Sequence, residues 1–206
     1  FLVQGRRVQT RNPRHARKLG ISLVPEERKT QSILGSMSIA QNISISNLDG
    51  VSAGTIVLNK RKERTAAQRF VTELRIRCSG VAQKVNTLSG GNQQKAIIAR
   101  TLFSEPSLLI FDEPTQGIDV AAKTEIYRLI YDFVDKGGAA IVISSELEEL
   151  VKLSDRIVVM REGRLIGEFN GRRLSVAGGN DNELAEKIMA MVAGVAQENR
   201  ATEETP

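Results

Sequence analysis

LLIFDEPT, residues Leu108–Thr115, decides the fold of this chain together with LSGGNQQK, residues Leu88–Lys95. The first is an apolar run of strand length that ends in two adjacent carboxylates, Asp112 and Glu113. Such a strand end is a typical place for a Mg²⁺ ion and an activated water beside a nucleotide phosphate. The second is a polar, glycine-containing turn that opens a helix, where unpaired main-chain N–H groups and the helix dipole favour an anion.

Beyond residue 105 the hydrophobic pattern alternates between strand and helix. Leu108–Phe111 and Ala139–Ile143 are short apolar runs, typical of buried parallel strands. Between them, Ala121–Val134 has apolar residues at helical spacing, and the glycines at Gly137 and Gly138 predict its end. A strand–helix–strand order of this kind predicts an α/β fold with a parallel sheet and helices on both of its faces.

The remaining elements are predicted from caps, turns and periodicity. They are a hairpin at Phe1–Val8, a helix at Pro13–Leu19 capped by Asn12, a strand at Ile21–Val24, helices at Lys60–Leu74, Asn92–Ser104, Glu146–Leu153 and Asn182–Val195, and a hairpin formed by Ile157–Met160 and Arg164–Phe169. The residues between Gly50 and Asn59 give no clear pattern. The last ten or so residues are expected to form a disordered tail.

The composition favours a globular protein with one substantial core. The chain has 206 residues, of which 41% are hydrophobic. It contains neither a run of about 20 apolar residues nor a signal-peptide pattern, so we expect a soluble, cytosolic location. Because the first residue is Phe1 rather than Met, we also expect the chain to be a piece of a longer protein or a processed form.

The cysteine and histidine content argues against thiol chemistry. Cys78 is the only cysteine, which excludes an intramolecular disulfide and a thiolate metal site. A catalytic thiol needs a base such as histidine, and the lone His15 is far from Cys78 in the sequence. We therefore interpret both residues as structural.

Basic residues are concentrated in the first part of the chain. Residues 1–75 hold 14 basic and 5 acidic side chains, whereas residues 76–206 hold 15 basic and 19 acidic ones. A basic half could bind nucleic acid, but these charges are spread over several predicted elements and the chain has no Trp. We therefore favour a solvated face, or one that docks against another subunit, and expect no nucleic-acid partner.

The two opening motifs resemble the signature motif and the Walker B motif of ABC-type ATPases. The NQQ that follows the glycines, the VPEERK at Val24–Lys29, and the segments DEPTQGID and IVISSE are similar to the C-terminal ABC domain of bacterial monosaccharide importers. These are the importers of the ribose, galactose, xylose and arabinose types, whose ATP-binding chains carry two ABC domains. The resemblance covers the chain up to about Gly171.

The resemblance implies an architecture as well as a family. We expect an ABC ATPase domain over residues 1–171, with a RecA-like P-loop NTPase core at about 106–170, a helical subdomain inserted before it at about 36–105, and the remnant of an N-terminal β-hairpin. Residues 172–206 would form a C-terminal extension with one helix and a disordered tail.

The resemblance also implies roles for individual residues. Asp112 would hold Mg²⁺ and Glu113 would act as the general base. Ser145 stands at the position of the usual switch histidine, and Glu26 at that of the Q-loop glutamine that communicates with the membrane subunit. The nucleotide-binding residues would be Asp119 of the D-loop, next to Gly117 and Ile118, and the signature residues Ser89, Gly90, Gly91, Asn92 and Gln93, which close over ATP held by a facing domain.

The implied function is ATP hydrolysis coupled to sugar uptake, with ATP and Mg²⁺ as cofactors. The partners would be a second ABC domain, a membrane permease and, indirectly, a sugar-binding protein, with the chain at the cytoplasmic face of the membrane. Three alternatives stay open: a nucleoside importer, a soluble ABC protein acting on DNA or ribosomes, and a degenerate domain that binds ATP without hydrolysing it. The short helical region and the lack of heptads count against the second alternative, and the retained carboxylate pair counts against the third.

One expected motif is absent from these residues. No GxxxxGK[ST] phosphate loop occurs, and Gly90–Lys95 has neither its spacing nor its Ser or Thr. In the family this loop lies upstream of the hairpin at Phe1–Val8, so truncation just past it is our interpretation. We predict that the 206 residues alone bind MgATP weakly and do not turn it over. Tight binding of MgATP by this chain in calorimetry would contradict the prediction.

Overall fold

The computed structural model describes residues 2–3, 5–53, 57–170 and 181–193. The described residues form two compact units, Phe1–Ile143 and Ser144–Pro206. Among them, no helix is both long enough and apolar enough to cross a membrane. The predicted domain limits near residues 36, 106 and 171 stay predictions.

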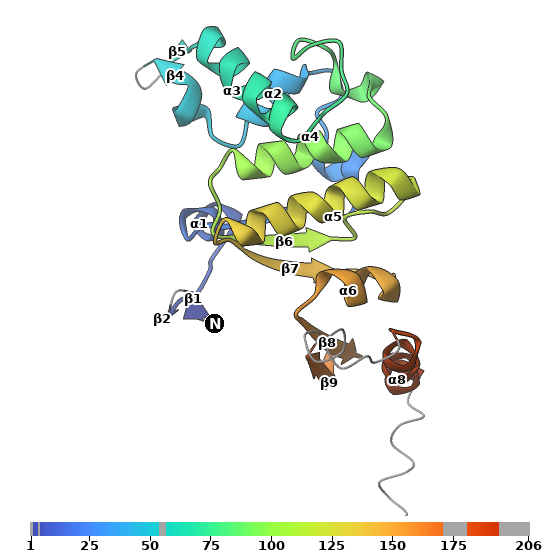
Figure 1. The fold of residues 1–206 in the computed structure, drawn as a ribbon. Helices are drawn as coiled ribbons and strands as arrows, with labels where there is room; N and C mark the ends of the chain where they lie inside the picture. Colours follow the sequence, from blue (N-terminus) through green and yellow to red (C-terminus); the bar gives the residue numbers. More distant parts are fainter. Residues whose placement is uncertain (1, 4, 54–56, 171–180, 194–206) are drawn as a thin grey trace, which may run out of the picture. The chain divides into compact units, whose positions relative to one another are not determined.

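The first unit is built on a three-stranded parallel sheet, as the sequence predicts. Its strands are β3 (Ile21–Val24), β6 (Leu108–Asp112) and β7 (Ala139–Ile143), in the spatial order β3-β6-β7. Figure 1 shows β6 and β7 next to each other, beside the helix α5 (Val120–Asp135). The strand β6 is central, and its Leu109 and Phe111 are fully buried. β3 lies outside the residues 106–170 predicted for the core, because the chain leaves the sheet after β3 and returns only at β6.

Among the described residues of the first unit, helices cover one face of this sheet and apolar side chains are exposed on the other, whereas the sequence predicts helices on both faces. The helices α4 (Gly90–Leu102) and α5 (Val120–Asp135) contact its outer strands, α4 at β3 and α5 at β7. On the opposite face Leu23, Ile141 and Ile143 are 51%, 48% and 50% exposed. Parallel sheets are normally covered on both faces, so this apolar face is a surface that other residues could cover.

The helical region lies between β3 and β6 in the sequence. Its elements are the short π-helix η1 (Arg28–Ser32), α2 (Ile39–Ser44), the 3₁₀ helix η2 (Leu48–Val51), the hairpin of β4 (Ser52–Ala53) and β5 (Val57–Leu58), α3 (Lys60–Glu73), and the 3₁₀ helix η3 (Val85–Thr87). The rings of Phe70 and Phe103 join α3 to the end of α4 with an edge-to-face contact, their centroids 6.0 Å apart. β4 and β5 lie between Gly50 and Asn59, where no element is predicted.

The predicted start of the chain is confirmed. A hairpin of β1 (Leu2–Val3) and β2 (Arg6–Arg7) precedes α1 (Pro13–Lys18). The side chain of Asn12 caps α1, because its Oδ1 accepts a hydrogen bond of 2.9 Å from the His15 amide. Gly20, at φ +75°, follows the end of the helix as predicted.

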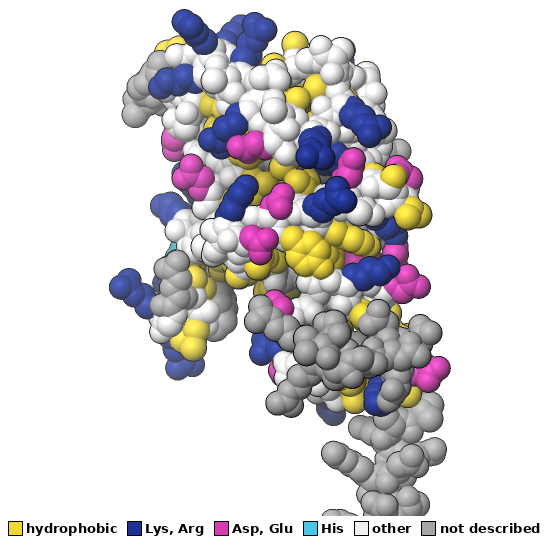
Figure 2. Space-filling view, in the orientation of Figure 1, with side chains coloured by type: hydrophobic (Ala, Val, Ile, Leu, Met, Phe, Trp, Pro, Cys, Tyr) yellow, Lys and Arg dark blue, Asp and Glu magenta, His cyan; other side chains and the backbone are white. Residues whose placement is uncertain are grey.

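Part of the excess basic charge of the first unit lies at one end of it. Figure 2 shows Lys and Arg side chains gathered over the end that carries β4, β5 and α3. The residues Lys60, Arg61, Lys62 and Arg64 at the start of α3 are all exposed. The same view shows an apolar area over α5. Tyr131 and Val134 of this helix are 44% and 38% exposed.

The second unit contains α6 (Leu147–Leu153), β8 (Arg156–Arg161), β9 (Arg164–Asn170) and α8 (Asp181–Ala193). Ile157, Val159 and Ile188 form its core. The predicted hairpin is confirmed, and Glu162 and Gly163 have φ values of +50° and +75°, the left-handed pair that a two-residue hairpin turn requires. The predicted tail and the last two residues of the predicted helix lie outside the described residues.

Candidate nucleotide site

The two predicted carboxylates lie at the carboxyl end of the central strand. Asp112 is the last residue of β6 and is half-buried. Glu113 follows at φ +44°, a left-handed conformation that costs a non-glycine residue about 1–3 kcal/mol. Its amide donates to the Ile143 carbonyl at 2.9 Å, and its carbonyl accepts from the Gln116 amide at 3.2 Å. The sheet edge on one side and the turn on the other therefore hold this backbone in place.

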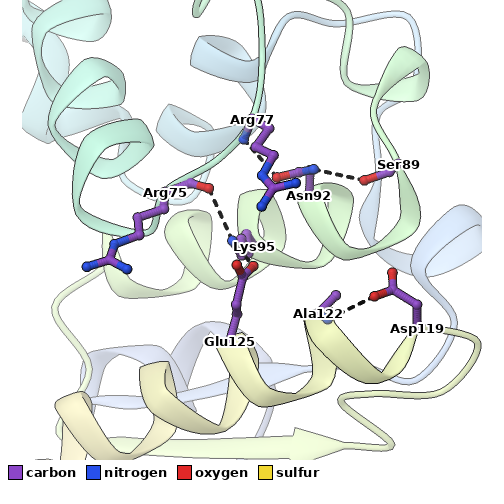
Figure 3. Close-up of polar contacts among 8 residues, drawn as sticks. All are labelled: Arg75, Arg77, Ser89, Asn92, Lys95, Asp119, Ala122 and Glu125. Atoms are coloured by element: carbon purple, nitrogen blue, oxygen red, sulfur yellow. Dashed lines mark hydrogen bonds and ion pairs between the residues drawn. The ribbon is translucent and has the colours of Figure 1, made fainter.

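The turn after the carboxylates leads directly into α5. The Oδ1 atom of Asp119 accepts a 2.9 Å hydrogen bond from the amide of Ala122, so Asp119 is the N-cap of this helix (Figure 3). An Asp at this position satisfies one of the unpaired amides of the first turn. The Asp119 side chain therefore bonds to the first turn of its own helix.

The predicted start of the helix that contains the signature-like motif, α4, is wrong by two residues. The sequence predicts a helix from Asn92, whereas α4 begins at Gly90 with Ser89 at its N-cap. Both glycines join the first turn because the Ser89 carbonyl accepts from the Gln93 amide at 2.9 Å. Ser89 is exposed, so the amino-terminal end of α4 and its dipole open toward solvent, as an anion site requires.

Two amide side chains of the motif hold this corner in place. Asn92 donates from Nδ2 to Ser89 Oγ at 2.8 Å and accepts at Oδ1 from the amide of Arg77 at 2.8 Å (Figure 3). Gln93 donates from Nε2 to the carbonyl of Leu88 at 3.2 Å. We predicted both residues as nucleotide contacts, and in this structure their side chains bond to protein atoms.

The lysine of the motif joins α4 to α5. Lys95 is 3% exposed, and its Nζ lies 2.5 Å from Oε2 of Glu125 and 3.1 Å from the carbonyl of Arg75 (Figure 3). The hydrogen bond from Lys95 lowers the pKa of Glu125, which partial burial alone would raise. The same helices touch at Gly91, where an added Cβ would lie only 2.7 Å from Cβ of Ala122. Glycine is therefore needed at that position.

We predict an asymmetric response when this ion pair is removed. Glu125→Ala leaves the buried Lys95 ammonium with one carbonyl acceptor and should cost about 1–2 kcal/mol of unfolding free energy, a value discounted because Glu125 is 38% exposed. Lys95→Met should cost less, because Glu125 can be hydrated.

The dependence on pH follows from the lowered pKa of Glu125. The stabilisation is complete above the ordinary Glu pKa of about 4.3 and is lost as the pH falls through the lowered pKa of the folded state. Urea denaturation should therefore show a gap between wild type and Glu125→Ala at pH 7 that closes in acid. An equal gap at both pH values would contradict the prediction.

The charged loop after β3 meets the carboxylate turn. Glu26 accepts at Oε1 a 3.2 Å hydrogen bond from Nε2 of Gln116. Arg28 bonds both to this turn and to the start of α4. Ser145 is exposed, lies two residues past the end of β7 and belongs to the second unit.

The structure therefore brings together most of the predicted residues of the first unit. Glu26, Glu113 and Asp119 lie on or beside one turn at the sheet edge, and Arg28 connects that turn to the corner at Ser89–Gln93. The sequence did not reveal Arg28, Lys95 or Glu125, whose partners are distant along the chain. Among the described residues, no three His, Cys, Asp or Glu side chains gather to hold a metal ion.

Comparison with known proteins identifies the family. The model of the family described as ABC transporter matches residues 1–116, more than half of the chain and both opening motifs. The chain belongs to the ABC transporter family. A solved structure of cbiO1 from Clostridium perfringens, part of the ABC transporter complex cbiONQ, shares the fold with a TM-score of 0.69 at 22% identity, over 97% of this chain and 75% of that one.

Curated relatives in this family are ATP-binding proteins for sugar import. The chain is 44% identical over 94% of its length to a ribose import ATP-binding protein, RbsA 2, of Rubrobacter xylanophilus. It is 42% identical over 93% of its length to a xylose import ATP-binding protein, XylG, of Moorella thermoacetica. It covers 35% and 36% of those two proteins, so it spans about a third of the length of the relatives that it matches.

Proposed function

We propose that this chain is part of the ATP-hydrolysing subunit of a carbohydrate ABC importer. The substrate class is supported by relatives that are named as ATP-binding proteins for the import of ribose, xylose and arabinose. The observation that carries the ATPase assignment is the carboxylate pair at the end of the central strand, with Glu113 in a strained left-handed conformation. Ligands of open α/β sheets bind at the carboxyl ends of the strands, and strain of this kind is concentrated at active sites.

The carboxylates fit a magnesium–nucleotide complex. Mg²⁺ is usually held by one or two carboxylates together with waters and substrate phosphates, so the single strand-end carboxylate of Asp112 is enough on the protein side. When bound, the metal would neutralise charge on the phosphates. Glu113, one residue further on, would accept a proton from the attacking water and orient that water.

The corner at Ser89–Gln93 would serve a second nucleotide. We propose that the amides at the start of α4 and the Ser89 hydroxyl contact phosphate oxygens of ATP held by a facing ABC domain. Support comes from the exposure of Ser89 and from the hydrogen bonds of Asn92 and Gln93, which fix the corner before any ligand arrives. Such pre-organisation reduces the entropic cost of binding.

Among the described residues, apolar side chains are exposed on one face of the parallel sheet. The edge strand β7 exposes Ile141 and Ile143, and Leu23 of β3 lies on the same face. We propose that a helix next to the phosphate loop covers this face in the complete protein, because exposed apolar faces of parallel sheets are rare.

The remaining roles concern coupling. Glu26 would communicate with a membrane permease and Ser145 would take the position of the switch residue near the γ-phosphate. A serine can donate a hydrogen bond to a phosphate but carries no charge. The protein would then act at the cytoplasmic face of the membrane, bound to the permease, and a sugar-binding protein would deliver the solute on the other side.

The experiment that tests this proposal uses the complete protein reconstituted with its permease in vesicles. ATP hydrolysis is measured with the binding protein loaded with ribose, xylose, arabinose, galactose or a nucleoside. We expect stimulation by one of the sugars. Stimulation by a nucleoside alone would favour the nucleoside importer, and an ATPase rate that no solute changes would contradict a role in import.

A further inference from the structure

The guanidinium of Arg28 joins two segments that lie far apart in the sequence. Arg28 opens the short helix η1, and its Nη1 donates to the carbonyl of Gly90 at 2.8 Å. Its Nη2 donates to the carbonyls of Gln116 at 3.1 Å and Gly117 at 3.3 Å. One side chain therefore bonds both to the first turn of α4 and to the turn that follows the carboxylates.

Two glycines leave the space that this guanidinium occupies. A Cβ added at Gly90 would lie 3.0 Å from Nη1 of Arg28, and one added at Gly117 would lie 3.3 Å from Nη2. Gly117 also has φ +64°, which other residues adopt only with strain. The two glycines thus allow the arginine fork to approach the main chain closely from both sides.

The position of Arg28 is not favourable for a cation in itself. Burial lowers the pKa of Arg28, because the charged form loses hydration. The side chain also lies at the positive, amino-terminal end of the α4 dipole, where a cation is disfavoured. The planar guanidinium offsets these costs by donating to three carbonyls at once, which a lysine ammonium cannot match in geometry.

Gln116 connects these bonds to the proposed base. The amide of Gln116 donates to the Glu113 carbonyl at 3.2 Å, while the carbonyl of Gln116 accepts from Arg28. On the other side, the carbonyl of Gly90 belongs to the corner that begins at Ser89. Arg28 is thus hydrogen-bonded to the turn that follows Glu113 and to the corner at Ser89–Gln93. These hydrogen bonds go to main-chain carbonyls and not to the Glu113 carboxylate or the Ser89 hydroxyl.

We propose that Arg28 is a positioning residue that keeps the Ser89–Gln93 corner and the Glu113 turn in one fixed arrangement. This inference rests on the proposed ATPase function. Through its hydrogen bonds to the turn, Arg28 orients the Glu113 side chain toward its water. Through its hydrogen bond to Gly90, it fixes the position of the Ser89–Gln93 corner relative to that turn. A second arginine also joins η1 to α4: Arg100 of α4 donates a hydrogen bond to the carbonyl of Ser32 at the other end of η1.

The test compares arginine variants in the complete protein. Arg28→Ala should lower kcat for ATP by about 10- to 100-fold, the effect of misplacing a catalytic group by about 1 Å. The Kd for MgATP should change little, because Arg28 touches no phosphate in this proposal. Arg28→Lys should recover part of kcat, and Arg64→Ala, on the exposed side of α3, should match wild type. Melting temperatures show whether each variant is folded.

Amide hydrogen exchange of residues 113–118 and 89–93 gives a readout that does not depend on turnover. In Arg28→Ala we expect faster exchange in both segments, without a change in β6 or α3. Unchanged exchange in both segments, or wild-type kcat in a folded Arg28→Ala protein, would overturn the inference. If wild type itself does not hydrolyse ATP, the proposed function fails, and the exchange result alone then decides whether Arg28 couples the two segments.

Discussion

Replacing Glu113 with glutamine in the complete protein is expected to lower steady-state ATP turnover by about 100-fold or more, while MgATP still binds. Glutamine keeps the size of the side chain and its hydrogen-bonding capacity, but it cannot accept the proton of the attacking water. The measurement is phosphate release under saturating MgATP, together with the Kd for MgATP.

The matched control for this experiment is Glu73→Gln, which removes a charge from an exposed carboxylate of α3. We expect the control to keep the wild-type rate. A Glu113→Gln protein with an unchanged rate would remove Glu113 from the role of base. Such a result would favour the alternative of a domain that binds ATP without hydrolysing it at this site.

Replacing Ser89 with arginine is expected to reduce turnover by about 100-fold, comparable to the loss of a donor to a transition-state oxygen. The bulky side chain would fill the exposed corner at the start of α4 and would keep phosphate oxygens away from its amides. The structural cost should be about 1 kcal/mol, because the Ser89 side chain caps no amide of the helix and the substitution removes only its exposed hydrogen bond with Asn92.

The control for Ser89→Arg places the same side chain elsewhere in the same region. Ala82 is exposed seven residues earlier, so Ala82→Arg adds an equal charge and volume away from the corner. ATPase rates and melting temperatures are measured for both variants. If the two variants had equal rates, the corner would not take part in the reaction.

Much of the fold could be predicted from the sequence where local signals agree. The strands β6 and β7 are short, continuous apolar runs, and α3 and α5 have apolar residues at helical spacing. The Asn12 cap and the Glu162-Gly163 turn follow from the chemistry of single residues. All of these are decided within a few residues, which explains why the prediction was correct.

The start of α4 shows the limit of such local signals. Glycine has a low helix propensity, so the pair at Gly90 and Gly91 indicated a turn. Tertiary packing decided otherwise, because Gly91 lies at the close contact with Ala122 and the carbonyl of Gly90 accepts from Arg28. The hairpin of β4 and β5 was missed because strands of two residues carry too short a pattern to recognise.

Only the part of the candidate site that is formed by contiguous residues could be predicted from the sequence. Motif spacing located Asp112, Glu113 and the corner at Ser89, whose chemistry lies in contiguous residues. The contacts of Arg28 join positions about 60 and 90 residues apart in the sequence, and the pair of Lys95 and Glu125 joins two helices. Nothing in a single sequence pairs such positions, so only the folded chain reveals them.

The most direct test of the account asks whether the Ser89 corner closes over a nucleotide when domains pair. The complete protein carries Ser89→Cys as a reporter, Cys78→Ser to remove the half-buried native thiol, and Glu113→Gln to slow hydrolysis. Maleimide labelling at position 89 is followed with and without MgATP. The account predicts fast labelling of the exposed corner without nucleotide and strong protection with MgATP. Equal labelling rates in both conditions would contradict it.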